Sequence, residues 1–150
     1  MDYHEQFDLL LTSVDSSAVF AAQADFFRLF YAHPEMRKVP FVNAFLIVSG
    51  WLGTSFRSGV WTFYEATPQQ DTAQAVRYLN ASGAAALAEM LQKGNHDYQD
   101  PQYQEDFDYP EEWITESEEI DRWIAAHEQE IMQHLTDELL AHRQQITEWL

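Results

Sequence analysis

The stretch PFVNAFLIVSGWLG, residues 40–53, is the most apolar part of the chain and contains no charged side chain. A membrane-spanning helix needs about 20 apolar residues. This run is shorter, so it predicts a buried helix at the centre of a core rather than a membrane span. Pro40 suits the first turn of such a helix, where its missing N–H costs no hydrogen bond. Gly50 and Gly53 weaken its end.

The sequence on both sides of this run is also helical in pattern, and alternating strand patterns or Asn-Gly hairpin signals are missing. Before the run, an apolar pattern starts at residues 7–11, and Asp15 or Ser16 can cap a following helix. After the run, Ser58 can cap a short helix, and Thr67 with Pro68 can begin the next one. We therefore expect a single compact all-α domain over residues 1–150, with about six to seven helices.

The last of these helices is expected to be long. Thr115 and Glu118 form the pattern of a capping box, and one helix, broken at most once, is predicted from there to Leu150. One face of that helix is apolar, and it consists of Ile120, Trp123, Ile124, Ile131, Leu135, Leu139, Ile146 and Trp149.

Composition narrows the class of protein. Hydrophobic residues make up 46% of the 150 positions and aromatic residues 15%, which is too much for a disordered chain. The chain has no cysteine, which excludes disulfides and thiolate chemistry and fits a reducing compartment. Acidic residues stand at the start where a secretory signal would be basic. The expected location is therefore cytoplasmic.

Charge is distributed unevenly along the chain. The formal net charge is −17, with −5 in residues 1–27, +2 in residues 28–93 and −14 in residues 94–150. Residues 95–121 hold eleven carboxylates and no Lys or Arg. Direct binding to nucleic acid or to an anionic membrane is disfavoured, because both need clustered Lys and Arg.

Metal binding and catalysis receive little support from the residue spacing. His127, His134 and His142 share the last helix with Glu130 and Glu138, yet neither Glu-x-x-His nor His-Glu-x-x-His occurs. The acidic loop lacks the ligand spacing and the glycine of a calcium loop, and no phosphate-binding loop is present. We expect no cofactor, no metal and no enzymatic activity.

The remaining candidate is an acidic surface that binds a partner. A solvated loop and helix face is the alternative reading of such a charge run, and it stays open. Aromatic residues among the loop acids favour an interface. The predicted partner-binding residues are Asp97, Asp100, Glu105, Asp106, Asp108, Glu111, Glu112, Glu116, Glu118, Glu119, Glu130, Asp137 and Glu138.

Residues 58–94, SGVWTFYEATPQQDTAQAVRYLNASGAAALAEMLQKG, resemble the core of the bacterial DNA-mimic protein family, a helical domain long catalogued as of unknown function. Gly59-Val60-Trp61 stands for the family's glycine-aromatic start and Ser82-Gly83-Ala84 for its Gly-Ala joint. Residues 120–143 resemble its closing helix. The resemblance implies an all-helical protein that imitates the charge of DNA to occupy a DNA-binding protein.

The expected partner is therefore a basic nucleic-acid-binding protein, such as a transcription regulator, whose access to DNA is blocked. An immunity or antitoxin protein that plugs a basic nuclease toxin is the main alternative, and a metal-dependent enzyme using the C-terminal His and Glu residues is a further one. Whether the core closes within one chain or is shared by a homodimer stays open. Self-repulsion of the acidic faces predicts that a dimer would join through the less charged middle.

Overall fold

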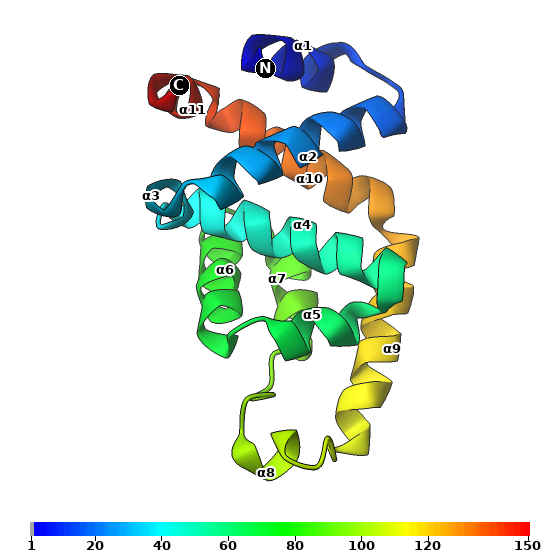
Figure 1. Cartoon of the computed structure of the whole chain (residues 1–150). Helices are drawn as coiled ribbons and strands as arrows, with labels where there is room; N and C mark the ends of the chain where they lie inside the picture. Colours follow the sequence, from blue (N-terminus) through cyan, green and yellow to red (C-terminus); the bar gives the residue numbers. More distant parts are fainter. Residues whose placement is uncertain (1) are drawn as a thin grey trace.

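Helix α4, Pro40–Ser58, runs through the middle of the computed structural model, which describes residues 2–150 (Figure 1). Nine of its side chains are buried, among them Phe45, Val48 and Trp51. Pro40 occupies the first turn, as predicted. The helix continues through Gly50 and Gly53 to Ser58, further than the glycines suggested, because neighbouring helices cover it on both sides.

The other helices lie on two sides of α4 (Figure 1). On one side are α1 (Tyr3–Thr12), α2 (Ser16–Ala32), α3 (Pro34–Arg37), α10 (Glu128–Ala141) and α11 (Arg143–Trp149). On the other are α5 (Val60–Ala66), α6 (Gln69–Ala81) and α7 (Ala85–Lys93). Helix α9 (Glu111–Ala126) runs along one edge, and α8 (Pro101–Gln104) lies at the far end. Residues 2–150 contain no strand, so the predicted all-α domain is confirmed.

The predicted number of six to seven helices is wrong, because residues 2–150 form eleven. Two extra helices, α3 and α8, are single turns inside segments expected to be connections, and each begins with a proline. The expected long final helix is divided in three, with breaks at His127 and His142.

Histidine side chains end these helices. His127 closes α9 and His142 closes α10, and in each the Nδ1 atom lies 2.8 Å from the carbonyl oxygen four residues earlier. His33 ends α2 through the same contact with Leu29. A carbonyl can only accept, so Nδ1 carries the proton in all three. At His33 the ring takes the place of the backbone donor to the Leu29 carbonyl, whereas the Trp123 and Glu138 carbonyls also accept from the backbone N–H of His127 and His142.

The predicted apolar face of the C-terminal region remains continuous across the breaks at His127 and His142. Ile120, Ile124, Ile131, Leu135, Leu139 and Ile146 are buried, and Trp123 and Trp149 are partly buried. Each break changes the direction of the chain without moving these residues to the solvent side. The face therefore follows the body of the molecule from α9 to α11.

Helix α9 begins at Glu111, four residues before the predicted start. The capping box at Thr115 does not form, and the Thr115 hydroxyl donates instead to the carbonyl oxygen of Glu111 at 3.4 Å. Pro110 precedes the first turn, and Glu111 and Glu112 within it suit the positive end of the helix dipole. The acidic loop is accordingly shorter than expected.

No helix in residues 2–150 has both the length and the apolar composition that a membrane crossing requires.

Candidate functional site

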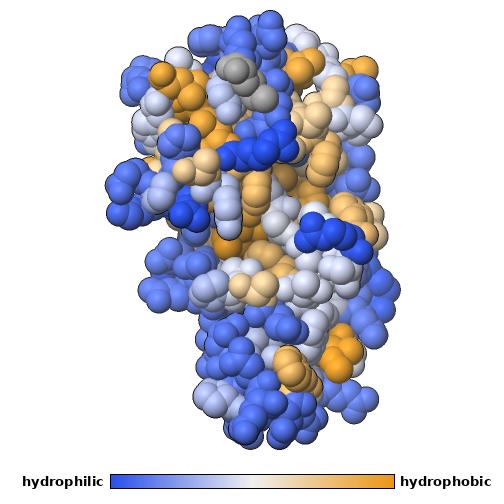
Figure 2. Space-filling model, in the orientation of Figure 1, coloured by the Kyte–Doolittle hydropathy of each residue, from blue (hydrophilic) through white to orange (hydrophobic). Residues whose placement is uncertain are grey.

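Ten of the thirteen predicted acidic-surface residues lie at the end of the molecule away from α1 and α11 (Figure 1). We call residues 97–119 the acidic end; they comprise the loop around α8 and the first half of α9. The space-filling view shows that this part of the surface is mostly hydrophilic, with a few apolar side chains set among the polar ones (Figure 2).

The chain enters the acidic end at Gly94, which lies directly against Tyr64. A Cβ atom at Gly94 would come within 2.3 Å of the Tyr64 ring. That ring cannot yield easily, because its hydroxyl donates to the Leu91 carbonyl at 2.8 Å and accepts from the Trp51 indole N–H at 2.9 Å. Burial raises the pKa of Tyr64 far above its ordinary value. Glycine at this position thus permits a close approach that no other residue would allow.

Three hydrogen bonds from amide side chains tie the loop to the body. The Asn95 amide donates to the Gln69 carbonyl at 3.1 Å, and the Gln69 amide donates back to the Asn95 carbonyl at 3.3 Å. Further on, the Gln99 amide donates to the Glu65 carbonyl at 2.9 Å. These bonds fix the loop backbone at the ends of α5 and α6.

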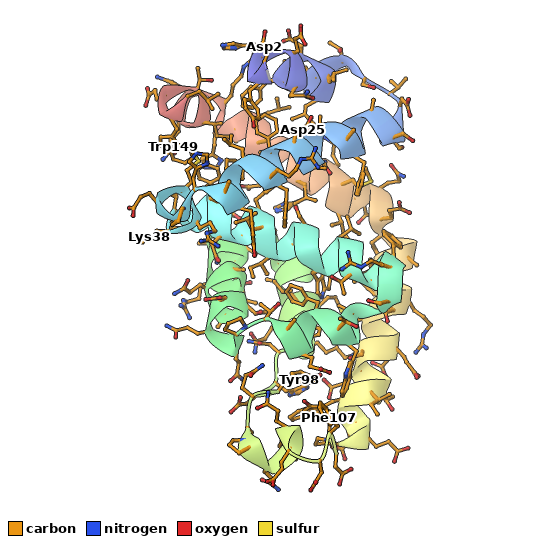
Figure 3. The ribbon with its side chains drawn as sticks, in the orientation of Figure 1. Asp2, Asp25, Lys38, Tyr98, Phe107 and Trp149 are labelled. Atoms are coloured by element: carbon orange, nitrogen blue, oxygen red, sulfur yellow. The ribbon has the colours of Figure 1, made fainter. Side chains whose placement is uncertain are left out.

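An aromatic cluster fills the inside of the loop, with Tyr98 at its centre (Figure 3). The Tyr98 ring lies 5.1 Å from Trp61, 5.3 Å from Tyr109 and 4.8 Å from Trp113, measured between ring centroids. Tyr103 packs on the outer side of Trp113 at 5.1 Å. Aromatic contacts of this kind add to the free energy gained by burying the rings. The loop contains four aromatic residues, Tyr98, Tyr103, Phe107 and Tyr109. The three tyrosines therefore pack in this cluster and stabilise the fold.

Phe107 is the fourth and points away from this cluster. Its side chain is 73% exposed, and its backbone has a φ of 51°, in the left-handed region that bulky residues rarely adopt. Its sequence neighbours Asp106 and Asp108 are exposed as well. Figure 3 shows Phe107 in the loop between α8 and α9. The loop thus presents one aromatic ring to solvent between two carboxylates.

The structure distributes the predicted site residues over three places. The loop holds Asp97, Asp100, Glu105, Asp106 and Asp108; α9 holds Glu111, Glu112, Glu116, Glu118 and Glu119; α10 holds Glu130, Asp137 and Glu138. Nine of the thirteen are exposed, and Asp100, Glu116, Glu119 and Glu138 are half-buried. The first ten belong to one continuous segment, and the three on α10 lie in another part of the fold (Figure 1).

Several of these carboxylates already have partners. Glu119 pairs with Lys93 at 2.5 Å, and this hydrogen bond lowers the pKa of Glu119 below its usual range. Glu116 lies 2.9 Å from His96, whose ring stacks on Trp113 at 4.5 Å. Asp100 caps α8 by accepting from the Gln102 N–H at 2.9 Å. The carboxylates without such contacts concentrate around Phe107.

Glu138 is engaged between helices. The Tyr78 hydroxyl donates to its carboxylate at 2.6 Å, and His142 Nδ1 lies 3.7 Å from the same group. Burial, together with this hydrogen bond, raises the pKa of Tyr78 well above its ordinary value. Glu138 thereby joins α10 to α6.

Asp121 is a structural carboxylate that the sequence reasoning did not single out. One of its oxygens accepts from the Ser55 hydroxyl at 2.6 Å and from the Val60 N–H at 2.9 Å. It therefore caps α5 from a helix far away in the sequence. Gly59, with a φ of 91°, makes room for it. Ser58, the predicted cap of this helix, is instead the last residue of α4, and its hydroxyl donates to the Thr62 hydroxyl at 3.3 Å.

The candidate metal ligands on the C-terminal helices do not converge. Within residues 2–150, no group of three His, Asp or Glu side chains is arranged so as to hold a metal ion. His127 and His142 are helix caps, and their rings stack on Trp123 and Phe41. Burial lowers the pKa of His134, the third of these histidines.

Comparison of the chain with protein-family models, with curated proteins and with solved structures finds no match in any of the three.

Proposed function

We propose that this protein binds a basic nucleic-acid-binding protein through its acidic end and occupies the surface that would otherwise contact DNA. The residues are those of the loop and α9, from Asp97 to Glu119, with Phe107 as the apolar anchor. Glu130 and Asp137 extend the negative field from α10 without belonging to the same contact.

Phe107 is the observation that carries this proposal. A solvated spacer has no use for a phenylalanine that is 73% exposed and held in an unfavourable backbone conformation. Aromatic side chains at interfaces supply much of the binding energy, and flanking charges raise the association rate and select the partner. Phe107 provides the aromatic ring, and its neighbours Asp106 and Asp108 provide the flanking charges, within three consecutive residues.

The charge balance of the loop supports the same conclusion. Between Lys93 and Arg122 there is no Lys or Arg to neutralise eleven carboxylates. Such self-repulsion destabilises the folded state, and a basic partner would remove it. Lys93, which precedes this segment, is already paired with Glu119.

The test begins with capture of proteins from lysate at low and high salt, followed by measurement of affinity for the captured partner. Retention should fall steeply as salt rises, because the screening length decreases from about 10 Å at 0.1 M to about 3 Å at 1 M. Duplex DNA should compete with this protein for the partner. Asp106→Asn/Asp108→Asn should weaken binding at low salt, and Phe107→Ala should weaken it by roughly tenfold or more.

A matched control is Glu5→Gln/Glu148→Gln, which removes the same number of charges from exposed positions on α1 and α11. Equal losses from both double variants would mean that only net charge matters and that the acidic end is no specific site. A partner that binds DNA and this protein simultaneously would also contradict the proposal. If the captured partner is a nuclease whose activity is blocked, the immunity-type alternative is the correct one.

A further inference from the structure

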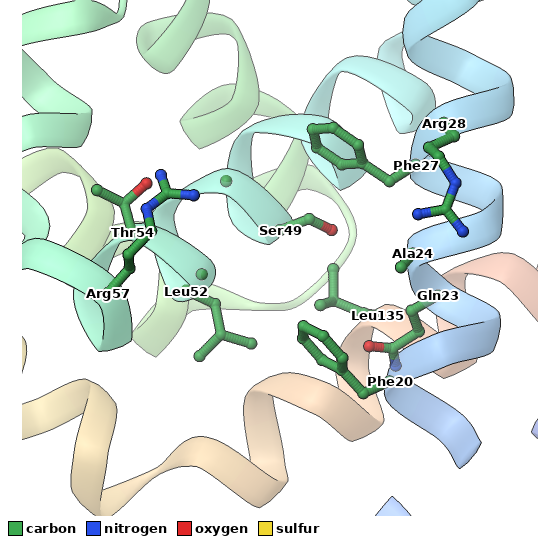
Figure 4. Close-up of a pocket in the computed structure, with 12 residues that line it drawn as sticks. Phe20, Gln23, Ala24, Phe27, Arg28, Ser49, Leu52, Thr54, Arg57 and Leu135 are labelled. Atoms are coloured by element: carbon green, nitrogen blue, oxygen red, sulfur yellow. The ribbon is translucent and has the colours of Figure 1, made fainter. Parts of the chain in front are cut away.

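A second feature lies on the opposite side of α4 from the acidic end: an apolar groove between α2, α4 and α10, with a volume of about 280 Å³ (Figure 4). Phe20, Phe27, Leu52 and Leu135 form its apolar walls. This volume is near the lower limit for small-molecule pockets. It suits a compact ligand body better than a protein segment.

Gly53 of α4 lies in the wall of the groove, where another residue would carry a side chain. A Cβ atom at Gly53 would meet no atom within 4 Å, and one at Gly50 would only touch the Phe63 ring at 3.8 Å. Neither glycine has a positive φ, so the backbone does not require them. Glycine at position 53 keeps the space open, at a cost in helix stability, whereas the contact with Phe63 places a Cβ at Gly50 toward α5 and outside the groove.

The apolar wall is incompletely covered. Phe20 stands at the edge of the groove and is 53% exposed, and Phe27 is half-buried. An apolar body placed between these rings and Leu52 would remove their surface from water, which is favourable in proportion to the area buried. Figure 4 shows both rings directed toward the same space.

Polar groups with free hydrogen-bonding capacity face the same space. The Ser49 hydroxyl is buried and has no hydrogen-bond partner within residues 2–150. Gln23 is oriented by two bonds from its amide nitrogen, to the Met132 carbonyl and to the Thr136 hydroxyl, each 2.9 Å long. Its oxygen therefore lies on the groove side (Figure 4). A buried polar atom without a partner is costly, and a bound ligand could satisfy it.

Two arginines stand at opposite ends of the groove (Figure 4). Arg28 is already paired with Asp25. Arg57 is exposed and, like Arg37, Arg77 and Arg122, forms no ion pair within the part of the chain that the structure describes; of these four arginines, Arg57 is the one that lines the groove. Carboxylates are plentiful elsewhere, so an unpaired arginine beside an apolar groove selects for an anion from outside the chain.

We propose that this groove binds a small amphipathic carboxylate, with its apolar body between Phe20, Phe27 and Leu52 and its carboxylate on Arg57. This site is independent of the acidic end and of the function proposed for it. The positive charge at Arg57 and the negative charge around Phe107 select opposite kinds of ligand.

The test is an NMR titration of the ¹⁵N-labelled protein with 4-phenylbutyrate and, separately, with its neutral amide, 4-phenylbutyramide. Both probes have the same apolar body, so their difference measures the charge. We expect 4-phenylbutyrate to shift the amide signals of Gln23, Ser49 and Gly53 at saturable concentrations. The neutral amide should bind roughly tenfold more weakly, the usual order for losing one charge-assisted hydrogen bond.

Variants locate the site. Arg57→Gln should reduce the affinity for 4-phenylbutyrate to that for the amide, while Arg77→Gln, an exposed arginine on α6 outside the groove, should change nothing. Gly53→Leu should fill the groove and abolish binding of both probes, because the position has room for a side chain. Circular dichroism verifies its fold, and the Arg57→Gln comparison stands even if Gly53→Leu does not fold.

Three outcomes would overturn the proposal. Equal affinity for the two probes, or an unchanged affinity in Arg57→Gln, would show that no carboxylate is recognised there. Absence of saturable shifts, or shifts spread over all exposed apolar residues, would show that there is no specific site. Self-association of the wild type in sedimentation, abolished by both Phe107→Ala and Gly53→Leu, would assign the groove to Phe107 of a second copy.

Discussion

The helical body around α4 and the acidic end are held together in different ways. The body buries large apolar side chains from α2, α4 and α10, and it tolerates a groove with two helical glycines in its wall. The acidic end has a smaller core, which consists of the aromatic cluster around Tyr98. It is attached at a few points where contacts are close and directional, chiefly Gly94 against Tyr64 and Asp121 against α5.

This difference separates two sources of stability. Burial of apolar area is spread over many residues, so a small change in one place is partly compensated by its neighbours. Neighbouring residues cannot compensate in this way for the loss of a close contact or of a single hydrogen-bonded carboxylate. Substitutions of similar size should therefore lower the free energy of unfolding much more where the acidic end joins the body than within the wall of the groove.

The largest effect is expected for Gly94→Ala. The new methyl group would come within 2.3 Å of a Tyr64 ring that two hydrogen bonds hold in place. We expect the free energy of unfolding, measured with urea, to fall by about 3 kcal/mol, at the upper end for an overpacked buried site. Hydrogen exchange in residues 95–110 should rise with it.

A double-mutant cycle identifies the cause. In a Tyr64→Ala background the ring is absent, so Gly94→Ala should cost only a fraction of its effect in the wild type. An equal cost in both backgrounds would show that the contact with Tyr64 is not what glycine serves at this position.

Asp121→Ala should have the next largest effect. It removes the acceptor for the Ser55 hydroxyl and the Val60 N–H, leaving the first turn of α5 uncapped. A loss of about 2 kcal/mol in the free energy of unfolding is expected from the cap and the hydrogen bonds together. Asp121→Asn keeps an oxygen in place and should lose less, and the exposed Glu118→Ala controls for removal of an acidic residue. Equal losses for the Asn and Ala variants would contradict this role.

Most of the body could be predicted from the sequence because hydrophobic periodicity reports which residues are buried. The central helix beginning at Pro40, the Asp15 cap of α2 and the apolar stripe from Ile120 to Trp149 follow from local patterns. The breaks at His127 and His142 were not predictable in this way. Their histidine rings close helices through hydrogen bonds that no periodicity encodes.

The candidate site was predictable in position but not in arrangement. The charge run located the acidic end, and most of its carboxylates are exposed. Sequence could not separate Phe107, which faces solvent, from Tyr98, which is buried at the cluster centre, because both are aromatic residues between acids. The capping role of Asp121 could not be predicted either, because its partners Ser55 and Val60 are distant in the chain.

Gly53→Ala offers the opposite result to Gly94→Ala from the same chemical change. Gly53 lies inside α4 with a helical backbone, and an added Cβ would meet nothing within 4 Å. Alanine is preferred to glycine inside a helix by roughly 0.5–1 kcal/mol, so the variant should be more stable by about that amount in urea denaturation. A loss of stability instead would mean that the groove wall has no more room than the junction at Gly94.

The smallest effect concerns His134, which is partly buried in α10 at the edge of the body. Burial lowers its pKa in the folded protein, and the nearby Glu138 and Asp137 oppose that shift only partly. The unfolded chain therefore takes up a proton near pH 6.5, while the folded chain does so only at lower pH. Stability must fall as the pH drops from about 7 toward the folded pKa, because protons then favour the unfolded state.

His134→Gln removes this contribution without adding charge. The difference in free energy of unfolding between wild type and variant should shift against the wild type between pH 7.5 and pH 5.5, by well under 1 kcal/mol because the ring is only partly buried. His4→Gln, at an exposed position on α1, controls for loss of an imidazole. Parallel profiles for wild type and His134→Gln would mean that the edge of the body does not penalise a charge at this position.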